Sequence, residues 1–121
     1  MKVRRIKIGI KSVKSILDDF VKTGEAVERG EKVKKETGTY FTSLEAFRKA
    51  LTPKRMELLH IVRTKRPSSI HELARMAKRD VKNVADDVKY LEQIGLIEKK
   101  ETKSRTAPVV TYEKLMLEIA V

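Results

Sequence analysis

The side chains that could bind a ligand gather in the second half of the chain. Lys82, Asn83, Asp86, Lys89 and Tyr90 follow one another at intervals of one or three residues. Such spacing places them on one face of a helix. Amide, basic and acidic groups on a helix are also the groups that read base edges in the major groove of double-stranded DNA. Any solvated helix face has a similar composition, but we expect these residues to contact DNA.

A second set of polar residues could hold the phosphate backbone. Ser69 lies at the start of a predicted helix, where free N–H groups and the helix dipole favour an anion. Long basic side chains on a hairpin can reach phosphates or the minor groove, although lysines also protect sheet edges from aggregation. The remaining candidate contacts are Arg79, Lys99, Lys100, Lys103 and Arg105.

Catalysis and metal binding have no comparable signature. The chain has 2 His, 5 Gly and no Cys, and neither His60 nor His71 has a second ligand four residues further on. The adjacent pairs Asp18-Asp19 and Asp86-Asp87 point about 100° apart on a helix, so neither pair readily shares a proton or a metal. We therefore expect no enzyme activity, no metal and no cofactor.

The composition favours an anionic partner. The 121 residues include 28 Lys and Arg and 17 Asp and Glu, so the formal net charge is +11. A field of this sign attracts nucleic acid or anionic membrane surfaces. Met1–Ile10 lacks the apolar run of a signal peptide, and no stretch is long and apolar enough to span a membrane. With no cysteine to suggest an oxidising compartment, we expect a soluble cytoplasmic protein.

The N-terminal part predicts an extension of strand and helix. Lys2–Ile10 alternates apolar and polar residues like a strand, and residues 11–28 have the period of an amphipathic helix. After a polar loop over 29–38, Thr39–Thr42 predicts a short strand, and Thr42 with Glu45 forms a capping box for a helix. One short helix cannot bury its own apolar stripe, so residues 1–50 are interpreted as a dimerisation extension. The stripe consists of Val13, Ile16, Leu17, Phe20, Val21 and Val27.

Residues 51–121 carry sharper helix boundaries. Thr52 before Pro53 predicts the start of a helix that ends before Pro67, and Ser69 with Glu72 predicts a short second helix. After a turn at Lys78-Arg79, Asp80 can cap a third helix that ends before Gly95. A basic hairpin with its tip at Glu101–Thr106 and a last alternating strand at Leu115–Val121 complete the order. This order is typical of a winged helix-turn-helix, so the expected fold class is α+β. The length itself favours one compact unit.

The residues also resemble a known family. The matching runs are Leu51–Leu59, Ser69–Arg75, Arg79–Val84 and Asp87–Glu98. Together they resemble a family of small archaeal and bacterial predicted transcriptional regulators with a MarR-like winged helix-turn-helix, and the N-terminal strand and helix are similar to that family too. The resemblance implies DNA binding by the third helix. The family usually has a basic residue where this chain has Asp86, which implies weaker binding or a rotated helix, unless Asp86 reads a cytosine amino group.

These observations predict a homodimeric regulator that binds double-stranded DNA, with the third helix in the major groove and the hairpin on the backbone. Two other functions stay open. The chain could be the antitoxin of a toxin–antitoxin pair, which holds a cognate toxin, or an architectural chromatin protein. Membrane binding is disfavoured because the polar side of the first helix carries Asp18, Asp19, Glu25 and Glu28.

Overall fold

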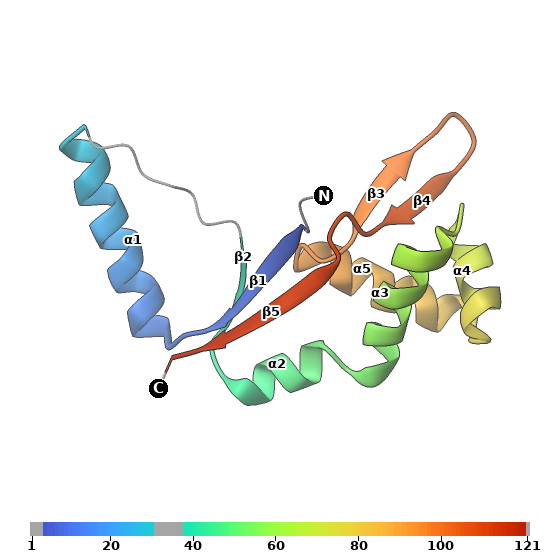
Figure 1. Ribbon diagram of the computed structural model, residues 1–121, viewed down its shortest axis with the longest axis horizontal. Coiled ribbons are helices and arrows are strands. Elements are labelled where there is room, and N and C mark those ends of the chain that lie inside the picture. Colours follow the sequence, from blue (N-terminus) through green and yellow to red (C-terminus); the bar gives the residue numbers. More distant parts are fainter. Residues whose placement is uncertain (1–3, 31–37, 121) are drawn as a thin grey trace. The chain divides into compact units, whose positions relative to one another are not determined.

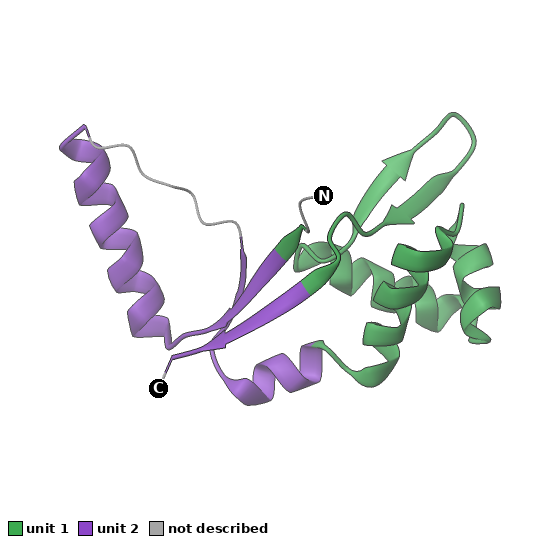
Figure 2. Cartoon of the chain, viewed as in Figure 1, with its two compact units in different colours: residues 1–5, 51–114 green, residues 6–50, 115–121 purple. Residues whose placement is uncertain are grey.

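The computed structural model describes residues 4–30 and 38–120 and shows a mixed α+β protein (Figure 1). The chain divides into two compact units, one built on residues 51–114 and the other on residues 6–50 and the last strand (Figure 2). The single compact unit expected from the length is therefore wrong. Strands from the two ends of the chain pair in one sheet, and most of this sheet belongs to the second unit.

Three helices form the centre of the first unit: α3 (Pro53–Lys65), α4 (Ile70–Ala77) and α5 (Val81–Gln93). Each begins at the expected cap, because a side-chain oxygen of Thr52, Ser69 or Asp80 accepts a hydrogen bond from the backbone N–H three residues later. The three helices pack on one another. Their shared core contains Leu58, Leu73, Val84, Val88 and Leu91, all at most 1% exposed.

The helix ends are tight. Arg66 after α3 and Lys78 after α4 adopt left-handed backbone conformations, with φ of 48° and 55°. These conformations are costly for residues with a Cβ atom, so helix packing must hold them in place. Gly95 has φ of 85° just beyond α5 and supplies the expected glycine turn.

A β-hairpin follows α5. β3 (Glu98–Glu101) pairs antiparallel with β4 (Thr106–Val109), so that Glu98 faces Val109 and Glu101 faces Thr106. Both strands project from the helices in Figure 1. The base of the hairpin is anchored in the core, because Leu96 and Ile97 are at most 2% exposed and the buried Tyr112 hydroxyl donates to the Leu96 carbonyl at 2.7 Å.

The second unit contains a three-stranded sheet. β1 (Arg5–Ile10) lies in the middle, with β2 (Gly38–Phe41) parallel on one side and β5 (Lys114–Ile119) on the other. Gly9 is required here, because a Cβ atom on it would lie 2.6 Å from the Tyr40 ring. α2 (Leu44–Ala50) covers β2 through an edge-to-face contact between Phe47 and Phe41.

Several expected boundaries are corrected. The last strand belongs with the N-terminal sheet and not with residues 51–114, because it pairs with β1. The cap of α2 is Ser43 and not Thr42, since the Ser43 hydroxyl accepts from the Ala46 N–H at 3.0 Å. The expected strand residues Lys2 and Val3, and most of the expected loop over 29–38, lie outside the described residues.

The helix α1 (Val13–Glu28) begins at Ser12, whose hydroxyl accepts from the Ser15 N–H. It is amphipathic as expected, but none of its residues is buried. No helix among the described residues is long and apolar enough to cross a membrane.

Candidate nucleic-acid interface

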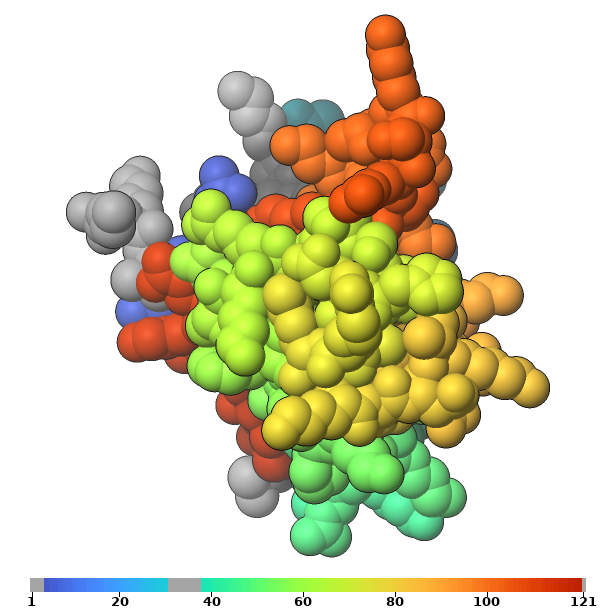
Figure 3. Space-filling model, turned by 90° about the vertical axis from the view of Figure 1, so that its right-hand side faces the viewer, coloured from blue at the N-terminus to red at the C-terminus, as the bar shows by residue number. Residues whose placement is uncertain are grey.

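The outward face of α5 carries four of the expected contact residues. Lys82, Asn83, Asp86 and Lys89 are all exposed. The opposite face is the buried stripe of Val84, Val88 and Leu91, which fixes the orientation of the polar face. Figure 3 shows α4 and α5 on one surface of the first unit, with the hairpin projecting beyond them. Polar and charged side chains of α5 are therefore accessible to a ligand on this surface.

Two expected contacts are directed inward. Arg79 donates a hydrogen bond from Nη2 to Asp87 Oδ2 at 2.8 Å, and its side chain is only 18% exposed. The guanidinium of Arg55 lies over the half-buried ring of Tyr90, with 4.2 Å between Arg55 Cζ and the ring centre. Arg55 in turn donates from Nε to Asp87 Oδ1 at 3.0 Å. The structure therefore assigns Arg79 and Tyr90 to an internal cluster.

This cluster of Arg55, Asp87, Arg79 and Tyr90 holds α3 and α5 together. Burial would raise the pKa of Asp87, but hydrogen bonds from Arg79 and Arg55, and the charges of these arginines, lower it below its ordinary value. Asp87 is therefore ionised at neutral pH and connects the first turn of α3 to the turn before α5. The cluster keeps the polar face of α5 in a fixed orientation relative to α3.

The start of α4 is linked to the hairpin. The hydroxyl oxygen of Ser69 accepts a hydrogen bond from the Glu72 N–H at 3.1 Å. The hydroxyl hydrogen of Ser69 can rotate and donate to a phosphate oxygen. The neighbouring Ser68 donates to the Glu72 carboxylate at 2.9 Å and accepts from Arg105 Nη1 at 3.2 Å. Arg105 therefore stands beside the N-terminus of α4, where its charge adds to that of the helix dipole.

The other hairpin cations differ in their surroundings. Lys99 forms an ion pair with Glu92 of α5 at 3.0 Å, which reduces its availability for phosphate. Lys100 and Lys103 are exposed. Of the four basic residues expected on the hairpin, these two are the best placed to reach a ligand from solvent.

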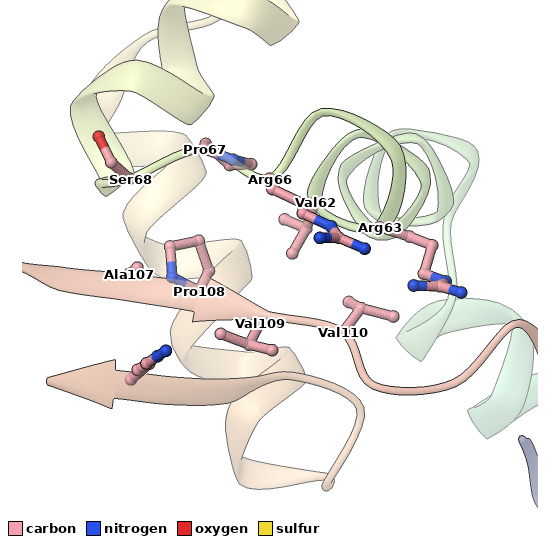
Figure 4. Close-up of a pocket in the computed structure, with 10 residues that line it drawn as sticks. Val62, Arg63, Arg66, Pro67, Ser68, Ala107, Pro108, Val109 and Val110 are labelled. Atoms are coloured by element: carbon pink, nitrogen blue, oxygen red, sulfur yellow. The ribbon is translucent and has the colours of Figure 1, made fainter.

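A hollow of about 430 Å³ lies between the end of α3 and β4 (Figure 4). Its floor is apolar, with Val62, Pro67, Pro108, Val109 and Val110. Arg63, Arg66 and Lys100 lie around it, and Arg63 also pairs with Glu113 at 3.3 Å. The positive surface thus extends from the hairpin to the end of α3.

Sequence reasoning missed Asp87, Arg55, Arg63 and Arg66. The last two belong to a visible basic run at the end of a predicted helix. Asp87 gave a weaker signal, because it is one of two adjacent carboxylates and nothing in the sequence separates its role from that of Asp86. Its partner Arg55 is 32 residues away, and only the tertiary fold brings the two together.

A family model described as HVO_A0114 matches residues 50–117, more than half of the chain. The chain belongs to the HVO_A0114 family. No curated protein and no solved structure matches it. The HVO_A0114 match covers α3, α4, α5 and the hairpin, and so contains every candidate contact described above. α1 lies outside the match. Among the described residues no group of His, Asp and Glu could hold a metal ion.

Proposed function

We propose that the HVO_A0114 region of this chain is a winged helix-turn-helix that binds double-stranded DNA, and that the protein is a transcriptional regulator. In this proposal α5 enters the major groove, the N-terminus of α4 faces a phosphate, and the β3–β4 hairpin is the wing on the backbone. The protein acts as a homodimer, so that two copies of α5 meet two half-sites.

The observation that carries the proposal is the division of α5 into two faces. Asn83 and Lys82 lie exposed in its first turns, while the valines and leucine behind them are almost completely buried. An amide near the start of such a helix can pair with adenine, and a lysine with guanine. The contacts of Asp87 with Arg55 and Arg79 support this proposal, because they connect α5 to α3 and base readout needs a helix held in one orientation.

The electrostatics add affinity without sequence preference. The net charge is +11, and Lys100, Lys103 and Arg105 place part of it on the wing. The exposed carboxylate of Asp86 opposes binding, since an acid facing phosphates repels them. We therefore expect modest affinity with a strong dependence on salt concentration.

The test is a titration of labelled duplexes by fluorescence anisotropy, together with a footprint on the DNA upstream of the protein's own gene. A regulator protects a defined site and prefers it over a scrambled duplex. If each dimer neutralises about six to ten phosphates, affinity falls on the order of 10³–10⁵ between 50 and 200 mM salt. Equal affinity for all duplexes would favour an architectural protein. No saturable binding at 50 mM salt would refute the proposal and leave a protein partner, such as a toxin, as the alternative.

A further inference from the structure

The helix α1 exposes an apolar face that the described part of its own unit does not cover. Phe20 is 78% exposed, and Val13, Leu17, Val21 and Val27 are between 56% and 60% exposed. Single exposed apolar residues are ordinary, but a continuous stripe of this kind marks an interaction surface. A turn of 100° per residue places all five side chains on one side of the helix.

Gly24 lies in the centre of this apolar face. A Cβ atom on it would meet nothing within 4 Å, so the space above the glycine is open. Glycine inside a helix is less stable than alanine, and no positive φ requires it at this position. A glycine here is useful if a large side chain from another helix packs against the backbone.

We propose that α1 pairs with α1 of a second copy of this chain, antiparallel, with Phe20 of each copy packed into the space above Gly24 of the other. The pairing deepens the homodimer of the proposed function by naming its interface. Ridge-into-groove packing places Phe20 among residues 17, 20, 21 and 24 of the second helix. This contact fixes the register: a residue of one copy then faces the residue of the other copy whose number brings the sum to about 40 or 41.

The charges beside the stripe favour the second copy as the partner and the antiparallel direction. Lys14, Glu25 and Glu28 lie along the same flank of the apolar face, with the cation in the first half of the helix and the acids in the second. When two helices run antiparallel, equal flanks face each other. In the proposed register, Lys14 of one copy lies between Glu25 and Glu28 of the other, and symmetry repeats the contact. A parallel pair would not bring these charges together.

Sedimentation velocity of the full-length protein tests the proposal. Between about 1 and 200 μM, a range suited to a small helix pair, we expect the mass to rise from 13.9 kDa to twice that value. Phe20→Asp should remain at 13.9 kDa throughout this range. Since Phe20 is 78% exposed, the variant should keep the thermal unfolding curve of the wild-type monomer. Lys22→Glu, on the far side of the helix, is the matched control and should still dimerise.

A charge exchange tests the direction. The single variant Lys14→Glu and the double variant Glu25→Lys, Glu28→Lys should each self-associate about tenfold more weakly than the wild type, because like charges then meet across the interface. Mixing these two variants should restore a heterodimer. No heterodimer, with intact dimerisation through Phe20, would overturn the antiparallel register. A wild-type monomer at all concentrations, an assembly larger than two, or a Phe20→Asp dimer would overturn the pairing itself. None of these measurements uses DNA, so their failure is separate from a failure of DNA binding.

Discussion

Asp87→Asn should destabilise the protein far more than the same change at the neighbouring Asp86. Asp87 accepts hydrogen bonds from two arginines at 2.8 and 3.0 Å, and the side chains of Asp87, Arg55 and Arg79 are only 16–21% exposed. Asparagine has the same shape but no charge. It offers one carbonyl oxygen to one arginine and turns an N–H group toward the other.

The magnitude follows from the contacts. A hydrogen bond to a charged group contributes about 1.5–3 kcal/mol, and removing one partner of a fully buried ion pair costs about 3–5 kcal/mol. The residual exposure of the three side chains lets water compensate in part, and asparagine keeps one of the two acceptors. We therefore expect a loss of about 2–3 kcal/mol in the free energy of unfolding.

Urea unfolding followed by circular dichroism at pH 7 measures this loss. Asp86→Asn is the control, because Asp86 is exposed and should change stability by less than about 0.5 kcal/mol. The folded state lowers the pKa of Asp87, so its contribution is complete above the ordinary pKa and is lost as the pH falls through the lowered one. The difference between wild type and Asp87→Asn should thus persist at about pH 5 and shrink below about pH 4. A loss no larger than that of the control, or a difference that grows in acid, would refute the reasoning.

Four further substitutions test the other parts of the structure. Asn83→Ala should weaken binding to the protein's own upstream DNA by about 1–3 kcal/mol and leave binding to scrambled DNA unchanged; equal losses on both would place Asn83 away from the bases. Lys103→Ala should weaken both duplexes alike and lower the salt slope by roughly one, whereas Asp86→Arg should tighten both; weaker binding by Asp86→Arg would instead indicate a contact between Asp86 and cytosine. Tyr112→Phe should cost about 1–2 kcal/mol in urea unfolding, because the Leu96 carbonyl loses its donor. Burial raises the pKa of Tyr112, so the stability that its hydroxyl contributes should fall above about pH 10 in the wild type only. An equal loss of stability above about pH 10 in Tyr112→Phe would contradict this assignment.

Local chemistry made much of the first unit predictable. Thr52, Ser69 and Asp80 were correct caps because a cap needs only a side-chain oxygen and the N–H three residues later. The hairpin was placed correctly for a similar reason, since Gly95 ends α5 and the polar tip between Glu101 and Thr106 sets the turn.

Long-range pairing was not predictable in the same way. The alternation of residues 115–119 indicates a strand but does not say which strand it joins. Its partner β1 lies about a hundred residues earlier in the chain. The inward position of Arg79 was missed for the same reason, because its sequence neighbours do not reveal the Arg55 guanidinium on the other side of Asp87. Helix periodicity predicts on which face of a helix a residue lies, but it does not identify the charged residue of another helix that contacts it.

The sheet formed by β1 and β5 affects the order in which the protein can fold during synthesis. The helices and hairpin of residues 51–114 lie within one compact unit, and they can form once that stretch has left the ribosome. The central strand β1 is made first but lacks one of its two neighbours until residues 114–119 emerge. High contact order of this kind slows folding. The nascent chain therefore carries an unpaired edge on β1 until β5 emerges. Lys7, which pairs with Glu118 in the finished sheet, places a positive charge on β1, and such charges disfavour aggregation through an open strand edge.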